Sequence, residues 1–214
     1  HLLPGVDDGV QSMEESLQIL REMEQQGIRR VWLTPHIMED IPNETLALQR
    51  KFRELLQQYR GAVELKLAAE YMLDNLFEER LEKEDLLLLE EGKRFLLVET
   101  SYFNPPMDFL SVLQRIQKKG YYPLLAHPER YEYMQKEDYN TLKEEHISFQ
   151  LNLPSLAGMY GKRVQGKAEW ILRNGMYDRM GCDTHSCHRY QQMLFSSIKH
   201  NQTKLLDGVN ANTL

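Results

Sequence analysis

Residues 121–131 read YYPLLAHPERY, an apolar run that stops at a histidine and continues into charged residues. The run is short and rich in aromatic and aliphatic side chains, which is typical of a strand buried in a sheet. An imidazole, a carboxylate and a guanidinium follow it directly, on His127, Glu129 and Arg130. The stretch raises the question whether functional groups gather where strands end.

Short apolar strands and amphipathic helices alternate along the whole chain. Strands are expected at residues 28–36, 63–70, 94–100, 121–127, 147–152 and 176–185. Helices are expected at residues 10–27, 43–59, 74–81, 106–119, 136–145, 167–174 and 190–200. Ser12 and Glu15 have the spacing of a capping box at the first helix, and Gly27 ends its pattern. This alternation predicts an α/β fold with a parallel sheet and crossover helices.

Length and composition indicate one domain in a reducing compartment. The 214 residues contain no Gly/Ser-rich or Pro-rich linker, so residues 1–214 are predicted to form a single domain. The net charge of -6, with basic residues scattered among acidic ones, disfavours nucleic acid as a partner. Two cysteines do not make a disulfide framework. No apolar stretch is long enough for membrane insertion and no signal peptide is recognisable, so we expect a cytoplasmic protein.

Polar residues stand at the end of every expected strand. In chain order these are His36, Glu70, Glu99, His127, Asn152, and Asp183 with His185. In a closed α/β barrel the carboxyl ends of the strands converge on one mouth, where active sites are built. A single histidine after a strand is more often a capping or solvated residue, but the recurrence of ligand-type side chains on five strands indicates a site.

These residue types favour a metal cluster. Imidazoles and carboxylates without a set of thiolates suit Mn²⁺, Fe²⁺ or Zn²⁺. With His1 included, four histidines and three carboxylates are too many for one ion. A cluster of two or three ions lowers the pKa of a bridging water, supplies hydroxide near neutral pH and stabilises a phosphate under in-line attack. Arg130 offers a planar fork of donors for a phosphate oxygen.

Six motifs spread over nearly the whole chain resemble one superfamily. They are HLLPGVDDG at 1–9, TPH at 34–36, AAEYMLD at 68–74, VETS at 98–101, AHPERY at 126–131 and CDTH at 182–185. The array is similar to the PHP (polymerase and histidinol phosphatase) superfamily. The PGVDDG and HPERY motifs more closely resemble its bacterial protein-tyrosine phosphatases of the CpsB/YwqE type, which are encoded with capsule or exopolysaccharide genes.

The resemblance implies a distorted (β/α)7 TIM-like barrel, the PHP fold, and a mechanism that depends on metal and not on cysteine. The first strand and the first Asp-x-His of the opening motif are expected to be missing from this sequence. The implied substrate is phosphotyrosine on a bacterial tyrosine kinase that controls capsule or exopolysaccharide synthesis. The implied cofactor is two or three divalent ions, with Mn²⁺ preferred over Fe²⁺ or Zn²⁺.

The same resemblance assigns roles to residues by position. The implied metal ligands are His1, His36, Glu70, Glu99, His127, Asp183 and His185. Glu99 is the implied bridge between ions, and Arg130 falls on a phosphate-binding position. Asp8 is the candidate for assisting the leaving group. Arg189 is a second candidate for binding substrate, although the SCHRY text around it differs from the longer polar loop of the family.

The sequence is also compatible with two other functions. One is a PHP phosphoesterase that acts on a small molecule such as histidinol phosphate, because a metal cluster recognises phosphate and not what is attached to it. The other is a degenerate barrel that binds a kinase tail or a polysaccharide enzyme without turnover. A thiolate phosphatase is disfavoured, because counting from Cys182 the arginine of a Cys-x5-Arg loop is replaced by His188.

Overall fold

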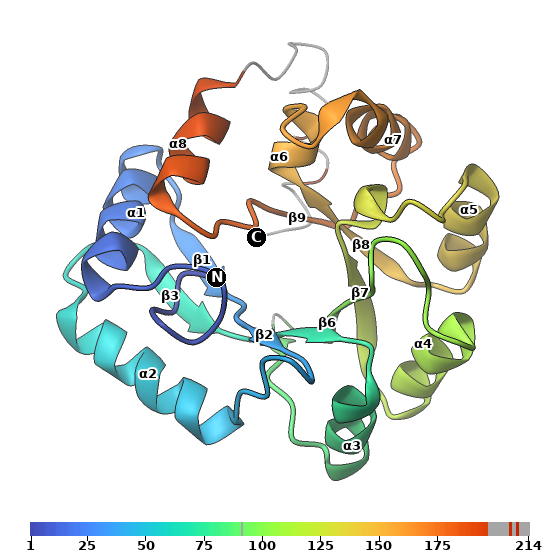
Figure 1. Ribbon diagram of the computed structural model, residues 1–214, viewed down its shortest axis with the longest axis horizontal. Helices are drawn as coiled ribbons and strands as arrows, with labels where there is room; N and C mark the ends of the chain where they lie inside the picture. The colour runs from blue at the N-terminus through green and yellow to red at the C-terminus, as the bar shows by residue number, and fades with distance from the viewer. Residues whose placement is uncertain (91, 197–205, 207–208, 210–214) are drawn as a thin grey trace. The chain divides into compact units, whose positions relative to one another are not determined.

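The computed structural model describes residues 1–90, 92–196, 206 and 209 (Figure 1). The chain divides into two compact units. The first unit comprises His1–Leu96 and Thr184–Gln191. The second comprises Leu97–Asp183 and the described residues from Gln192 onward. Each unit is described below by itself.

The first unit contains two parallel strand pairs. Strand β1 (Arg30–Leu33) pairs with β3 (Glu64–Leu67), and β2 (His36–Ile37) pairs with β4 (Glu70–Met72). Each of the first two expected strands is therefore divided in two. Pro35 lies between β1 and β2 and has no backbone N–H to give to a ladder, which explains the first interruption. In the second pair His36 lies directly opposite Glu70, so two predicted ligands are neighbours in the register.

Three helices complete most of this unit: α1 (Met13–Gln25), α2 (Thr45–Gln58) and α3 (Asn75–Lys83). The hydroxyl of Ser12 caps α1 by accepting from the N–H of Glu15, which is one half of the predicted capping box. The carboxylate of Glu15 accepts from the N–H of Cys187. Helix α2 lies beside β3 (Figure 1). Buried side chains of the unit include Ile19, Leu20, Met23, Leu33, Ile37, Leu48, Leu55, Tyr71 and Phe77.

Strand β6 (Arg94–Glu99) begins in the first unit and ends in the second. Its start pairs antiparallel with the short strand β5 (Leu89–Glu90), which the sequence did not predict. The second unit holds the parallel strands β7 (Tyr122–Ala126), β8 (Ser148–Asn152) and β9 (Arg179–Gly181). Their register places Asn152 opposite Gly181, two residues before Asp183.

Helices and apolar side chains surround these strands. The helices are α4 (Phe109–Lys118), α5 (Lys136–Glu144), α6 (Leu153–Leu156) and α7 (Gly161–Arg173), with the 3₁₀ turn η1 (Pro128–Arg130) after β7. Helix α4 packs next to β7, and α7 next to α6 (Figure 1). The buried core includes Leu97, Val98, Leu113, Ile116, Leu124, Leu125, Ile147, Phe149, Leu151 and Ile171.

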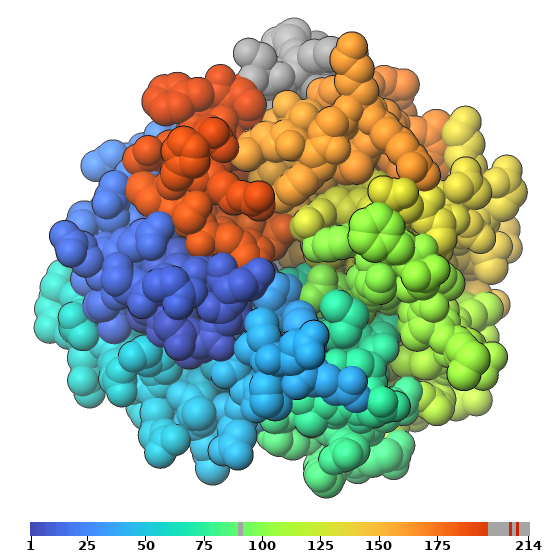
Figure 2. Space-filling view, in the orientation of Figure 1, coloured from blue at the N-terminus to red at the C-terminus, as the bar shows by residue number. Residues whose placement is uncertain are grey.

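Helix α8 (Cys187–Phe195) begins three residues earlier than the predicted helix at 190–200. The hydroxyl of Ser186 accepts from the N–H of Arg189, so a serine cap starts the helix there. The start of α8 lies next to α1 (Figure 2), where Gln18 donates to the Sγ of Cys187 and Gln191 donates to Glu22. Residues 197–200 of the predicted helix lie outside the described residues. Among the described helices, none has the length and apolar character needed to cross a bilayer.

Candidate functional site

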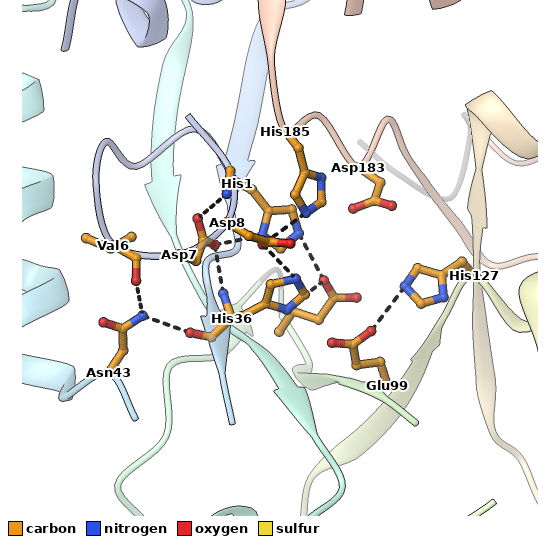
Figure 3. Close-up of polar contacts among 12 residues, drawn as sticks. His1, Val6, Asp7, Asp8, His36, Asn43, Glu99, His127, Asp183 and His185 are labelled. Atoms are coloured by element: carbon orange, nitrogen blue, oxygen red, sulfur yellow. Dashed lines mark hydrogen bonds and ion pairs between the residues drawn. The ribbon is translucent and has the colours of Figure 1, made fainter. Parts of the chain in front are cut away.

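Three imidazoles and a carboxylate gather in the first unit. Figure 3 shows His1, His36 and His185 around Asp8. The ring centroid of His1 lies 4.2 Å from that of His36 and 4.0 Å from that of His185. Oδ1 of Asp8 lies 3.6 Å from Nε2 of His36 and 3.5 Å from Nε2 of His185. One donor atom from each of the four lies within 4.8 Å of the others, which is the spacing of ligands around a common ion.

Glu70 adds a buried carboxylate to this group. Its side chain is 3 % exposed, and its Oε2 lies 3.1 Å from Nε2 of His1 and 3.7 Å from Nδ1 of His36. The pairing of β2 with β4 places it there, because His36 and Glu70 occupy opposed positions at the start of the two strands. The parallel ladder thus brings together a histidine and a glutamate that are 34 residues apart.

The loop before α1 holds His1 in place. The carbonyl oxygen of His1 accepts from the N–H of Val10, which closes the loop. A Cβ atom at Gly9 would overlap the Cβ and the carbonyl oxygen of His1, so only glycine allows this close approach. Farther along, Asn43 donates to the carbonyl oxygens of Val6 and His36, which ties the loop to β2 (Figure 3).

Asp7 orients the His1 ring. Its Oδ2 lies 2.8 Å from Nδ1 of His1 and accepts from the N–H of His36, while Oδ1 accepts from the N–H of Gly9. Burial alone raises the pKa of Asp7, but the hydrogen bond and charge of His1 together with the two backbone N–H groups outweigh it and hold the pKa below its usual value. Because Nδ1 of His1 faces an ionised carboxylate, Nε2 is the nitrogen left to bind a metal.

The chemistry of this donor set fits a divalent transition metal. Three imidazoles with two carboxylates match the preference of Mn²⁺, Fe²⁺ and Zn²⁺ for nitrogen and oxygen ligands. The carboxylate behind His1 repeats the carboxylate–histidine pairing that supports metal ligands in proteins. The first unit therefore contains a group of residues suited to hold a metal.

The second unit places its predicted ligands at strand ends. Glu99 ends β6 and His127 follows β7, and Oε2 of Glu99 lies 3.5 Å from Nε2 of His127 (Figure 3). Both side chains are 3 % exposed. His127 and Asp183 have φ values of 33° and 46°, in the left-handed region that L-residues rarely adopt. Strained backbone of this kind concentrates at functional sites.

Arg130 is held between two aromatic rings. Its guanidinium carbon lies 4.4 Å from the ring centroid of Tyr102 and 4.4 Å from that of Tyr160. Its Nη1 donates to Oδ2 of Asp183 at 2.7 Å. The cation is thus fixed by two cation–π contacts and one ion pair, with 16 % of its side chain exposed.

The family model for capsular polysaccharide synthesis proteins, CpsB/CapC, matches residues 1–210. The chain belongs to the CpsB/CapC family. The tyrosine-protein phosphatase YwqE of Bacillus subtilis is 27% identical over 193 residues, which cover 87% of this chain and 75% of the relative. The tyrosine-protein phosphatase CpsB of Streptococcus pneumoniae is 28% identical over 203 residues, covering 87% and 81%.

A solved structure shares the fold of this CpsB/CapC chain. It comes from crystal structures of YwqE from Bacillus subtilis and CpsB from Streptococcus pneumoniae, described as unique metal-dependent tyrosine phosphatases. The TM-score is 0.81 at 23% sequence identity, over 100% of this chain and 93% of the other. The match confirms the predicted α/β fold class, and the family match confirms the resemblance to the CpsB/YwqE type.

The structure also brings residues to the site that the sequence had assigned otherwise. Asp8, predicted to assist the leaving group, lies among three histidines in the position of a ligand. The PGVDDG motif contains both Asp7 and Asp8 but does not say which carboxylate faces which imidazole. The tyrosines that flank Arg130 were not predicted, because the position of Tyr102 directly after the VETS motif does not show which side chain its ring faces, and Tyr160 lies outside every motif. Arg189 lies exposed on α8.

Cys187 of this CpsB/CapC chain lacks the features of a nucleophile. Both cysteines are free thiols, and Cys187 lies against Gln18 and Glu22. Burial, followed by the charge and hydrogen bond of Glu22, raises the pKa of the Cys187 thiol. A raised pKa lowers the fraction of reactive thiolate, whereas thiolate enzymes lower it. The environment of Cys187 therefore argues against this residue as a nucleophile.

Proposed function

We propose that this protein is a metal-dependent protein-tyrosine phosphatase that acts in capsule or exopolysaccharide synthesis in the cytoplasm. The observation that carries the proposal is the group formed by His1, Asp8, His36 and His185, whose donor atoms lie within 4.8 Å of one another. Membership of the CpsB/CapC family and the names of the relatives support the same activity. We propose that residues 1–214 form one phosphatase domain of the PHP type, and the family model, which matches residues 1–210 and so includes residues of both units, supports this.

Two or three divalent ions are proposed as the cofactor, with Mn²⁺ preferred over Fe²⁺ or Zn²⁺. The proposed ligands of the first unit are His1, Asp8, His36, Glu70 and His185, and those of the second unit are Glu99, His127 and Asp183. Such ions, when bound, supply hydroxide near neutral pH and neutralise charge on the oxygens of a phosphate. Glu99 is proposed as the bridging carboxylate. As a ligand Asp8 has no proton to give, so its assignment as the group that assists the leaving oxygen is replaced here by that of a ligand.

Arg130 is proposed to bind the phosphate of the substrate. Its guanidinium is already oriented by Tyr102, Tyr160 and Asp183, so little freedom is lost when it donates to a phosphate oxygen. Arg189 is proposed as a second cation for the substrate. The substrate is phosphotyrosine in a protein, with a bacterial tyrosine kinase as the proposed partner. A tyrosyl oxygen has a reference pKa of about 10, so it leaves as phenolate with little help from an acid.

Substrate competition and metal analysis separate this proposal from its two alternatives. A tyrosine-phosphorylated peptide and histidinol phosphate are offered together to protein that has been incubated with Mn²⁺, and the bound Mn²⁺ is measured. Preferential release from the peptide supports the proposal, and preferential release from histidinol phosphate favours the small-molecule phosphoesterase. No release together with no bound Mn²⁺ favours a binding barrel without turnover.

Arg130→Ala gives the matched test of the phosphate site. By analogy with the loss of one oriented donor in other hydrolases, kcat falls about 10²- to 10³-fold. Arg173→Ala is the control, because Arg173 is exposed on α7 and pairs only with Glu169 among the described contacts. If Arg130→Ala and Arg173→Ala have equal kcat and KM, Arg130 does not bind the phosphate.

A further inference from the structure

Asn152, the last residue of β8, contacts a predicted metal ligand through its side chain. Its Nδ2 donates to Oδ2 of Asp183 at 2.9 Å, and Nη1 of Arg130 donates to the same oxygen at 2.7 Å. Asn152 itself is 2 % exposed. A carboxylate oxygen held by two donors from different directions has its orientation fixed, so Asn152 and Arg130 together set how Asp183 presents its other oxygen.

A second layer of buried groups holds Asn152. Its backbone N–H donates to Oε1 of Glu129 at 3.0 Å, and the hydroxyl of Tyr177 donates to Oε2 of the same glutamate at 2.9 Å. Glu129 is 0 % exposed and Tyr177 is also buried. Both carboxylate oxygens of the buried Glu129 thus accept hydrogen bonds, and one of these bonds holds the backbone of Asn152 in place.

The amide of Asn152 is a poor choice for stability alone. Its Oδ1 is buried, and no group among the residues that the structure describes donates a hydrogen bond to it. A buried acceptor without a donor is destabilising, whereas an apolar side chain of similar size carries no such penalty. Packing by itself would therefore favour leucine at this position. What leucine lacks is the N–H that Asn152 gives to Asp183.

We propose that Asn152 is a positioning residue for the metal ligand Asp183, and that Glu129 and Tyr177 hold Asn152 for this purpose. The proposal rests on the proposed function in one respect, namely that Asp183 binds metal. Asp183 needs such support because its backbone is left-handed at φ 46°, a conformation that the surrounding structure must maintain. Asn152 touches neither phosphate nor leaving group in this scheme and acts only through Asp183.

The test is Asn152→Leu in the full chain, with the Mn²⁺ dissociation constant measured by calorimetry. Loss of a partner behind a metal ligand is expected to weaken Mn²⁺ binding about 10- to 100-fold. The urea midpoint in the presence of a chelator is expected to equal or exceed that of the wild type, because the unpaired Oδ1 is removed. Saturating Mn²⁺ is expected to restore kcat. Asn140→Leu, at an exposed position of α5, is the control and should bind Mn²⁺ as the wild type does.

Tyr177→Phe is the second variant, to be used if Asn152→Leu does not fold. It removes the hydroxyl that donates to Glu129, and it should weaken Mn²⁺ binding by a smaller factor than Asn152→Leu. An unchanged Mn²⁺ dissociation constant in the folded variants, or a lower urea midpoint with unchanged Mn²⁺ binding, would overturn the positioning role. A wild type that binds Mn²⁺ but releases no phosphate from phosphotyrosine would refute the proposed function alone, because the comparison of Mn²⁺ affinities would still decide this proposal.

Discussion

Replacing Tyr160 by leucine removes one of the two rings that hold Arg130 and leaves its ion pair with Asp183 in place. A cation–π contact contributes about 0.5–1 kcal/mol when exposed and about 2 kcal/mol when desolvated. Since only 16 % of the Arg130 side chain is exposed, the upper part of this range applies, about 1–2 kcal/mol. That corresponds to a loss of about 5- to 30-fold in phosphate binding by Arg130.

The assay is hydrolysis of a tyrosine-phosphorylated peptide at saturating Mn²⁺, with inorganic phosphate as a competitive inhibitor. Tyr160→Leu should lower kcat/KM and raise the inhibition constant of phosphate by similar factors, because both depend on the same guanidinium. Tyr160→Phe keeps the ring face and should remain close to the wild type. If folded, metal-loaded Tyr160→Leu matches Tyr160→Phe in both quantities, the ring does not position Arg130 and the reasoning is refuted.

Three further predictions concern the first unit and the cysteines. Asp7→Asn should weaken Mn²⁺ binding about 10- to 100-fold by calorimetry, because His1 loses its anionic partner. The pKa of Asp7 is lower in the folded protein than its unfolded value near 4, so the ionised carboxylate stabilises the fold fully above about pH 4. This stabilisation is lost as the pH falls through the folded pKa. The urea midpoint of Asp7→Asn should therefore depend less steeply on pH below about 4 than that of the wild type. Asp8→Asn should lose Mn²⁺ and slow nitrophenyl and alkyl phosphates by equal factors; a much larger loss on alkyl phosphates, with normal Mn²⁺ content, would identify Asp8 as an acid. Cys182→Ser combined with Cys187→Ser should keep kcat within about threefold of the wild type, and inactivity of this folded variant would return the mechanism to a thiolate.

The strand ends were predictable from the sequence because local composition determines them. A short apolar run that stops at a polar residue predicts both the strand and the position of its last side chain, which is why Glu99 ends β6 and His127 follows β7. His36 and Glu70 were also expected to end strands, but each begins a short second strand, β2 or β4, because the first two expected strands are interrupted. The split of the first expected strand follows from Pro35, which has no backbone N–H for a ladder. Predicting this split also requires knowing the strand with which residues 30–37 pair. The early start of α8 follows from the Ser186 cap, and a serine at this place is a helix-start signal that the sequence contains.

Contacts between segments that are distant along the chain could not be predicted from the sequence. Tyr102, Arg130 and Tyr160 lie about 30 residues apart along the chain, in a loop, a 3₁₀ turn and the residue before α7, and nothing local to any of them predicts the stack. The adjacent Asp7 and Asp8 have different partners only because the closed loop turns one carboxylate toward His1 and the other toward His36 and His185. Such assignments depend on side-chain direction, which sequence spacing does not give.

The most direct measurement is phosphate release from a tyrosine-phosphorylated peptide, made on the Mn²⁺-loaded protein and again after chelation, with metal content determined in both samples. We expect release with about two or three ions bound per chain, loss of release when a chelator removes them, and recovery when Mn²⁺ is added back. Release that persists in the fully chelated protein, or no release from the folded protein with its ions bound, would contradict it.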